Sequence, residues 1–418
     1  MDGVAKFLSI KPETILSGLC RLPNLVFEVT NICNLSCTYC AYSDLYSGYD
    51  SREDKFMHFD QAKTVIDYLL NIWRSNSSLD FPKRLNIGFY GGEPLLNTKL
   101  IREITDYAEK QDNLGRTLSY SMTTNAVLLD KHIDFLVEKQ FDLLISLDGD
   151  EYAQSYRIDK QGKNSFARVF NNVKYIQKYY PQFFDKHVSF NAVLHNKNDI
   201  GPLYDFFVGH FAKVPLIAPL NPDGVKKEKA CMFNELYNDY SESFLKVIEK
   251  KTIEKLSFMA SPQLDRFYRQ FDLKSGNIFS DYRDMLFDRE KVGIIPSGTC
   301  LPFTKKMFIT VNGKILPCER IDHKHFFGVV KDNQVMLDFD EIARSHNKNI
   351  FKFISQCTSC VLKTRCNECL YQLNTLDGRD DICLSYLNDR ADYKIDLSPL
   401  RTHPDILHKI LYELQVMN

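Results

Sequence analysis

The chain has 418 residues, which is enough for two or three domains around a large buried core. Its 53 basic and 54 acidic residues almost cancel, so composition gives no sign of nucleic acid or an anionic membrane as a partner. No apolar run approaches the ~20 residues of a membrane span, and the N-terminus lacks the order of a secretory signal. We therefore expect a cytoplasmic protein that binds neither nucleic acid nor a membrane.

The first half of the chain alternates short apolar runs with amphipathic helical patterns. The candidate strands are 25–29, 85–90, 118–123, 142–147, 188–194 and 214–220. The helical patterns between them are 61–73, 98–110, 131–140, 166–180 and 200–212. Strands that alternate with helices of this length predict an α/β fold built from βα units around a parallel sheet. Six units fit a partial (β/α)6 barrel of the TIM type better than a closed eight-fold one.

The pattern changes after residue 222. Residues 232–256 show helical periodicity, residues 307–318 predict a β-hairpin, and residues 405–416 predict a final helix. The expected organisation is an N-terminal extension at 1–24, an α/β core at 25–222, a helical connection at 223–295, a cysteine-rich domain at 296–395 and a C-terminal helix at 396–418.

Twelve cysteines are unlikely to form disulfides in a reducing compartment, and their clustering indicates metal or iron–sulfur ligation. Three of them form the motif 33-CNLSCTYC-40, directly after the first predicted strand. A structural zinc site takes four protein ligands, and no fourth lies nearby, although zinc or chance spacing stays an alternative. Three thiolates suit a [4Fe–4S] cluster that keeps one iron open.

Polar motifs follow the next strands at the same edge of the predicted sheet. They are 91-GGEP-94, 124-TN-125 and 146-SLDG-149. Because the carboxyl ends of parallel strands carry the chemistry of α/β folds, these motifs and the cysteine loop predict one site.

The cysteine loop, with Tyr39 in its aromatic position, resembles the signature of the radical S-adenosylmethionine (SAM) superfamily. The resemblance implies that the amino and carboxylate groups of SAM complete the cluster held by Cys33, Cys37 and Cys40. It further implies that 91-GGEP-94 (Gly91, Gly92, Glu93 and Pro94) receives the amino group of the cofactor, although such a stretch alone could be a simple turn.

Three further positions match SAM contacts of that superfamily. Ser146 and Arg157 match the residues that hold the ribose and the carboxylate, and a guanidinium suits a carboxylate because it pairs bidentately. The alternative for Arg157 is a surface charge. Leu216 or Ile217 could contact the adenine, or could simply pack in the core.

The downstream cysteines resemble the SPASM domain, an auxiliary-cluster extension of radical SAM enzymes, although 366-CNEC-369 is one residue shorter than the usual form. The resemblance implies that one auxiliary [4Fe–4S] cluster is held by Cys357, Cys360, Cys366 and Cys383. It implies a second, held by Cys300, Cys318 and Cys369. The second cluster then has an open iron or a fourth ligand such as Cys231, and one or two zinc sites are the alternative.

The resemblance implies reductive cleavage of SAM to a 5′-deoxyadenosyl radical, which takes a hydrogen atom from a peptide. Two groups of enzymes fit. Peptide maturases form thioether or carbon–carbon crosslinks, and anaerobic sulfatase-maturating enzymes make formylglycine from Cys or Ser. The latter carry a catalytic Asp where this chain has Glu319, so Glu319 is the candidate base. The incomplete second cysteine set and 318-CERI-321 favour a peptide maturase. An iron–sulfur electron carrier and a zinc-scaffolded interaction protein remain alternatives from other classes.

Partners follow from the same resemblance. The substrate would be a ribosomally made precursor peptide or a sulfatase-type protein. Only 24 residues precede the first strand, fewer than a leader-binding domain of roughly 80–90 residues needs, so a separate partner or residues 223–295 would bind the leader. By analogy, flavodoxin or ferredoxin would donate electrons.

A few side chains outside these motifs carry expectations of their own. Cys20 and Cys231 are interpreted as small buried apolar residues. His323 and His325 are interpreted as parts of a solvated loop, with metal ligation as the alternative.

Overall fold

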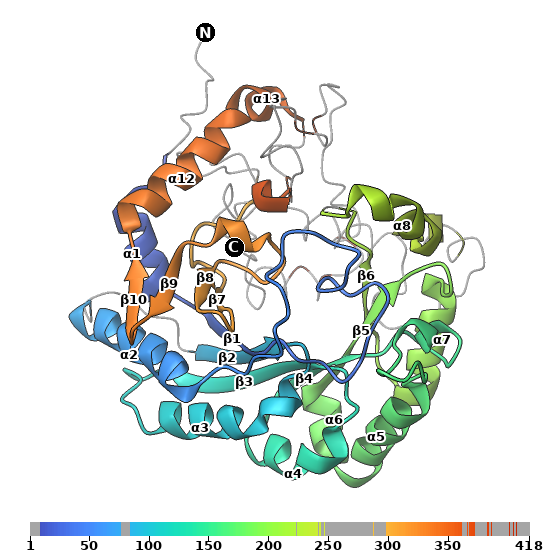
Figure 1. Ribbon diagram of the computed structural model, residues 1–418. Helices are drawn as coiled ribbons and strands as arrows, with labels where there is room; N and C mark the ends of the chain where they lie inside the picture. Colours follow the sequence, from blue (N-terminus) through green and yellow to red (C-terminus); the bar gives the residue numbers. More distant parts are fainter. Residues whose placement is uncertain are drawn as a thin grey trace. The chain divides into compact units, whose positions relative to one another are not determined.

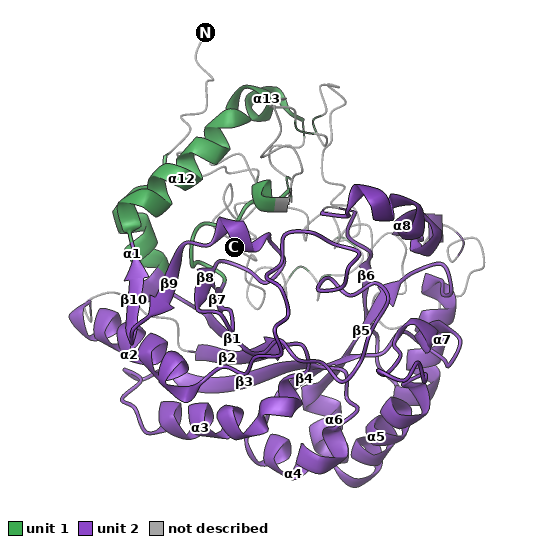
Figure 2. Ribbon diagram, in the orientation of Figure 1, with its two compact units in different colours: residues 1–18, 250–305, 338–418 green, residues 19–249, 306–337 purple. Residues whose placement is uncertain are grey.

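The computed structural model describes residues 9–76, 84–222, 224–240 and 298–361, together with 242, 243, 246, 287, 366, 368–372, 383, 386, 401, 404 and 407. The chain divides into two compact units (Figure 2). The smaller unit comprises residues 1–18, 250–305 and 338–418, and the larger comprises residues 19–249 and 306–337. Each is described by itself.

A ten-stranded sheet forms the centre of the larger unit (Figure 1). Six neighbouring strands run parallel: β1 (Asn24–Thr30), β2 (Arg84–Gly91), β3 (Thr117–Thr124), β4 (Asp142–Ser146), β5 (Val188–Leu194) and β6 (Leu216–Pro219). They are the six strands that the sequence predicts. The outer strands β6 and β10 do not pair among the described residues, so the sheet is a partial barrel.

Helices cover the outer face of the curved sheet (Figure 1). They are α2 (Phe59–Ser75), α3 (Thr98–Glu109), α4 (Leu129–Glu138), α5 (Phe166–Tyr179), α6 (Pro181–His187) and α7 (Ile200–Phe211). Short 3-10 turns follow β2, β4 and β6: η1 (Pro94–Asn97), η2 (Ala153–Tyr156) and η3 (Lys227–Lys229). The amphipathic pattern explains the packing of α2, because Val65, Leu69 and Trp73 share its buried face. The indole Nε1 of Trp73 donates to the carbonyl of Leu19 at 3.0 Å.

Four more strands extend the sheet beyond β1. They are β7 (Met307–Ile309), β8 (Lys314–Leu316), β9 (Gly328–Lys331) and β10 (Gln334–Leu337), with the turn η5 (His323–His325) between β8 and β9. The predicted hairpin is present as β7 and β8, and Gly313 turns the chain with φ +85°. Because β7 pairs in parallel with β1, residues 306–337 cluster with the sheet, whereas the predicted boundary puts them in a separate cysteine-rich domain.

The smaller unit contains α12 (Phe339–Lys352), α13 (Ile354–Ser359) and the turn η7 (Leu370–Gln372), and α1 (Pro12–Cys20) begins in it. The carboxylate of Asp338 caps α12 by accepting from the Glu341 amide at 2.9 Å. The carboxamide of Asn347 bonds both backbone groups of Ile10, which ties the N-terminal segment to α12.

The predicted helical connection at 223–295 is described only in part, and includes α8 (Ala230–Leu236). The predicted C-terminal helix at 396–418 lies almost entirely outside the described residues. Among the helices that are described, none combines the length and apolar character that crossing a membrane requires.

Candidate active site at the carboxyl ends of the strands

The cysteine loop leaves β1 and is held by the segment that follows β4. The amide of Ser36 donates to the carbonyl of Ile158 at 2.7 Å, and that of Thr38 donates to Tyr156 at 3.1 Å. Burial raises the pKa of Cys33 and raises that of Cys37 to about 12, and the neighbouring cysteines of the loop raise both further. The loop therefore gathers thiols that stay protonated until a positive centre joins them.

A cavity of about 500 Å³ opens beside these thiols. All three cysteines line it. So do the predicted residues Gly91, Gly92, Ser146 and Arg157, together with Arg52, Tyr90, Thr123, Asn125, Lys229 and Met232. Seven of the residues predicted for cofactor or cluster binding are thus brought together. Tyr39, Glu93, Pro94 and Leu216 do not line this cavity.

The two glycines lie against the chain's own backbone. Gly91 has φ +140°, and a Cβ on it would be 2.1 Å from the carbonyl oxygen of Thr30. A Cβ on Gly92 would be 2.0 Å from the carbonyl oxygen of Ile32. The sequence interpretation assigns the need for glycine to close approach by the cofactor. The structure adds a nearer cause, because the end of β2 must pack against the chain that leads into Cys33.

Glu93 connects the ends of β2 and β3. Its fully buried carboxylate accepts from the Thr124 hydroxyl and the Asn125 amide, both at 2.7 Å, and from the Leu95 amide at 3.1 Å. Burial raises its pKa to about 7, although these hydrogen bonds favour the ionised form. Its oxygens are therefore engaged within the protein, and Pro94 follows as the first residue of η1.

Asn125 is a polar neighbour of the cysteine loop that the predicted site residues omit. Its Nδ2 donates to Asn34 Oδ1 at 2.7 Å and lies 3.7 Å from Cys33 Sγ. The signal for it was present in the sequence, because 124-TN-125 follows the third strand at the same edge as the other motifs.

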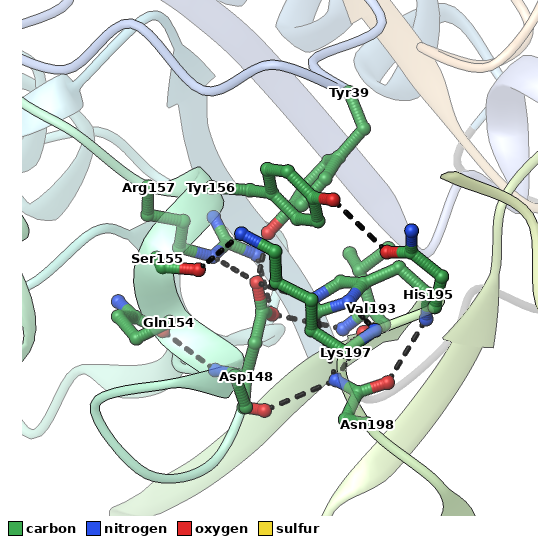
Figure 3. A network of polar contacts seen from close by, with 12 residues as sticks. Tyr39, Asp148, Gln154, Ser155, Tyr156, Arg157, Val193, His195, Lys197 and Asn198 are labelled. Atoms are coloured by element: carbon green, nitrogen blue, oxygen red, sulfur yellow. Dashed lines mark hydrogen bonds and ion pairs between the residues drawn. The ribbon is translucent and has the colours of Figure 1, made fainter. Parts of the chain in front are cut away.

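A buried network of hydrogen bonds and ion pairs around Asp148 contacts the cysteine loop at Tyr39 (Figure 3). Arg157 forms two bonds with Asp148, Nε to Oδ2 at 2.9 Å and a terminal nitrogen to Oδ1 at 3.0 Å. The hydroxyl of Tyr39 donates to the same carboxylate. Burial by itself would raise the pKa of Asp148, but Arg157 and His195 lower it to about 2. The fork of Arg157, predicted to meet a carboxylate of the cofactor, thus already pairs with one inside the protein.

His195 and Asn198 complete this network from the loop after β5. The fully buried ring of His195 stacks on Tyr39 with centroids 5.6 Å apart, and Tyr156 meets it edge-on at 5.1 Å. Asn198 Nδ2 donates to the carbonyl of Asp148 at 3.1 Å. Tyr39 therefore fixes the cysteine loop to β4 and β5, which explains why an aromatic residue stands within the loop.

A second cavity, of about 480 Å³, lies along the inner face of the sheet. Its lining includes Asn86, Gly88, Ser121, Leu144, Leu216, Lys306 and Glu319, and it shares Tyr90 and Thr123 with the first cavity. Leu216 is 61% exposed and lies here, so the adenine contact predicted for it is not made from the wall of the first cavity. Among the described residues, Tyr90 and Thr123 line both the cavity that holds the thiols and the cavity that holds Glu319.

Glu319 is held as a carboxylate in the second cavity. Its Oε2 is 2.7 Å from Lys306 Nζ and 3.6 Å from Cys318 Sγ. Burial would raise the pKa of Glu319, but Lys306 and Arg320 outweigh it and the pKa is lowered. The group can therefore accept a proton at neutral pH.

Four of the downstream cysteines lie close to one another. Burial raises the pKa of Cys357 to about 12, and Cys366, Cys383 and Cys360 raise it further because they lie close by. These are the four predicted ligands of one auxiliary cluster. For the other predicted cluster, Cys318 belongs to the larger unit while Cys300 and Cys369 belong to the smaller, so that assignment stays a prediction.

No three Cys, His, Asp or Glu side chains in the described part of the chain are placed to chelate a single metal ion. The three loop thiols instead line one cavity. Three such thiols are a donor set that suits a larger group, such as an iron–sulfur cluster.

Two expectations for single residues are wrong. Cys231 is exposed on α8, whereas Cys20 is fully buried as expected. His323 is 2% exposed, because the loop before Asp50 covers it and the Gly48 carbonyl accepts from the His323 amide at 2.7 Å.

Sequence and structure comparisons match this chain to known proteins. The family described as "Radical SAM superfamily" matches residues 27–207. An uncharacterized protein of Methanocaldococcus jannaschii, MJ0907, is 30% identical over 58% of this chain and 80% of its own length. A cysteine-type anaerobic sulfatase-maturating enzyme of Clostridium novyi is 26% identical over 54% of this chain and 61% of its own.

Two further comparisons extend over more of the chain. The radical SAM cyclopropyl synthase TigE of Paramaledivibacter caminithermalis is 23% identical over 71% of this chain and 65% of its own. The chain thus spans less than two thirds of the Clostridium novyi and TigE proteins. The solved structure "Native anSMEcpe with bound AdoMet and Cp18Cys peptide" has the same fold, with a TM-score of 0.58 and 18% identity over 83% of this chain and 88% of that one.

Proposed function

This chain belongs to the radical SAM superfamily and is an enzyme, and we propose that it is a peptide maturase that forms a thioether or carbon–carbon crosslink. The observation that carries the proposal is the pair of cavities joined at Tyr90 and Thr123. One offers three thiols and the other a carboxylate. Such a pair suits a reaction in which a cofactor on one side acts on a substrate on the other.

In this proposal, Cys33, Cys37 and Cys40 hold a [4Fe–4S] cluster, and SAM binds beside Gly91, Gly92, Ser146 and Arg157. When bound, these groups supply one-electron cleavage of SAM and removal of a hydrogen atom from an unactivated carbon. The fit is supported by the cavity that these residues line and by thiols whose raised pKa requires a positive centre for ionisation.

The protein's own groups position the loop and shield it. Asp148 accepts from Tyr39 and from Arg157, which holds the segment between Cys37 and Cys40 against β4. Glu93 holds the turn after β2 against β3. Because Asp148 and Glu93 are fully buried, the floor of the site is inaccessible to water and its geometry is preorganised.

Glu319 is proposed as the base in the second cavity. Lys306 favours the ionised carboxylate, which can take the proton that a substrate thiol or carbon loses as the new bond forms. The one electron that remains after the hydrogen atom and the proton have left would pass to an auxiliary [4Fe–4S] cluster. The surrounding wall is mixed: Leu144 and Leu216 are apolar, and Asn86 donates to the Ser121 hydroxyl at 2.8 Å. Such a wall suits a peptide segment with both apolar and polar side chains.

The proposal includes two auxiliary [4Fe–4S] clusters with the predicted ligands. Support for one comes from the mutual proximity of Cys357, Cys360, Cys366 and Cys383. The other, at Cys300, Cys318 and Cys369, rests on the cysteine spacing. The electron donor would be flavodoxin or ferredoxin, and a separate partner would bind the leader of the precursor peptide.

A second candidate is an anaerobic sulfatase-maturating enzyme that makes formylglycine from Cys or Ser. The similarity to the Clostridium novyi enzyme favours it, as does the carboxylate directly after Cys318. The products separate the two candidates. A crosslink removes two hydrogen atoms and links two fragments in tandem mass spectra, whereas formylglycine carries an aldehyde that reacts with hydrazides.

Anaerobic reconstitution tests the proposal. We expect about eight to twelve irons per chain and 5′-deoxyadenosine only when a reductant is present. Iron without 5′-deoxyadenosine would identify an electron carrier, and colourless protein that contains zinc would identify a scaffold. Co-expression with short candidate peptides, followed by mass spectrometry, then identifies the bond.

A further inference from the structure

We propose that Arg52 is the cation that compensates the negative charge of the cluster at Cys33, Cys37 and Cys40, and thereby raises its reduction potential. The inference rests on the proposed function and adds to it a residue that no sequence motif marks. It concerns the ease with which the site accepts an electron, which is the step that starts the reaction.

Arg52 lines the first cavity together with the three cysteines. Its guanidinium carbon lies 4.5 Å above the ring of Tyr42, which is two residues beyond Cys40. Its Nε is buried and has no hydrogen-bond partner. Within the described part of the chain, no carboxylate pairs with Arg52 at 4.0 Å or closer. Arg52 as a whole is partly exposed, so water solvates part of its charge. The anionic cluster expected in this cavity would be the counter-charge that its guanidinium lacks.

The direction of the electrostatic effect is visible at Glu28 in β1. The charge of Arg52 lowers the pKa of Glu28, although burial raises that pKa to about 7 overall. Glu28 does not neutralise Arg52 by direct pairing, since its carboxylate accepts from the Val311 amide at 2.9 Å.

Two other cations around the cavity differ from Arg52 because each forms an ion pair with a carboxylate. Arg157 forms its two-bond pair with the buried carboxylate of Asp148. Lys229 lies 2.9 Å from Asp44, whose side chain is 71% exposed, so water screens this pair. Among the described residues, Arg52 is therefore a cation of this cavity that forms no ion pair with a carboxylate, unlike Arg157 and Lys229.

A cation close to a redox centre stabilises the state with the extra electron. Removing one charge at a partly buried site should change the ratio of reduced to oxidised cluster roughly tenfold, which for one electron equals about 59 mV. The shift should go to more negative potential.

The test is a redox titration of the reconstituted full-length protein with dithionite, followed by electron paramagnetic resonance. The signal of the cofactor-binding cluster is identified by its change on addition of SAM, which separates it from auxiliary clusters. Arg52→Gln should shift its midpoint by about 59 mV to more negative potential. Arg52→Lys should restore most of the wild-type value. The control Arg168→Gln, at a partly exposed arginine that lines neither cavity, should leave the midpoint unchanged.

Each other result contradicts the inference. An unchanged midpoint in Arg52→Gln, with the SAM-responsive signal present, would overturn it and leave the proposed function standing. A shift in Arg52→Lys as large as in Arg52→Gln would show that stacking on Tyr42 matters and the charge does not. If Arg52→Gln does not take up iron, Arg52→Met provides a second neutral variant for the same titration. A wild-type protein without any SAM-responsive signal would overturn both the inference and the proposed function.

Discussion

The two cavities of the larger unit share the wall formed by Tyr90 and Thr123 but differ in their charged groups. The first lies at the carboxyl ends of the strands and offers protonated thiols and cations. The second follows the inner face of the sheet and offers one carboxylate paired with Lys306. Under the proposed function, this difference would divide the reaction: the first cavity would generate the reactive group, and the second would receive the proton that the product leaves behind.

Replacing Cys33, Cys37 and Cys40 together by Ala should have the largest effect, because it removes the donors of the first cavity and leaves the second intact. We expect 5′-deoxyadenosine formation to fall below detection and bound iron to fall by about four atoms per chain. Chromatographic assay of 5′-deoxyadenosine and iron analysis measure both. The control is Cys20→Ala, since this buried thiol belongs to none of the proposed clusters. If the triple variant still cleaved SAM, the assignment of the first cavity as the site of the cofactor-binding cluster would be wrong.

Asp148→Asn should have the next largest effect, because it leaves the buried guanidinium of Arg157 without a charged partner. The free energy of unfolding should drop by about 3–5 kcal/mol. Asp130→Asn is the matched control, since its pair with Arg168 at 2.7 Å is partly exposed and should contribute less than about 1 kcal/mol. Urea unfolding compares the two variants. Equal losses in both would mean that the network below Tyr39 carries no special stability.

Glu319→Gln should separate the functions of the two cavities. The modified peptide should decrease roughly 100-fold while 5′-deoxyadenosine still forms, because only the proton acceptor is lost. Glu319→Asp keeps the carboxylate and serves as the control, with a smaller loss. The ratio of product to 5′-deoxyadenosine is the measurement. If both products decreased together in Glu319→Gln, the carboxylate would be needed for the first cavity, and the division would be wrong.

Glu93→Gln should have the smallest effect, which is confined to the pH dependence of stability. Its pKa is raised from 4.5 to about 7, so the folded protein binds this proton more tightly than the unfolded chain. Stability from this group is therefore complete below pH 4.5 and is lost as pH rises toward 7, by up to about 3 kcal/mol. Urea unfolding between pH 4.5 and 7 should show that the free energy of unfolding depends less on pH in the variant than in the wild type.

Glu28 has a similarly raised pKa and is present in both proteins, so the difference between their profiles isolates Glu93. Glu103→Gln, at a surface position beside Lys99, should reproduce the wild-type profile. A variant of Glu93 with the full wild-type slope would show that another group carries the titration.

The sequence by itself determined the order of the βα units and the edge at which the site lies. Periodicity identifies strands and helices because each buried face repeats with a fixed spacing, and parallel strands bring their carboxyl ends together. The spacing of Cys33, Cys37 and Cys40 predicted that these thiols share one site, because residues close in sequence lie close in space, and all three line the same cavity.

Tertiary structure alone decided which side chains are free to act. The sequence cannot show that Arg157 is engaged by Asp148 whereas Arg52 is unpaired, because both facts depend on contacts between residues far apart in the chain. It also could not place His195 on Tyr39, or β7 beside β1. Local patterns report what a residue can do, and only the packing of distant segments sets the burial and the partners that determine what it does.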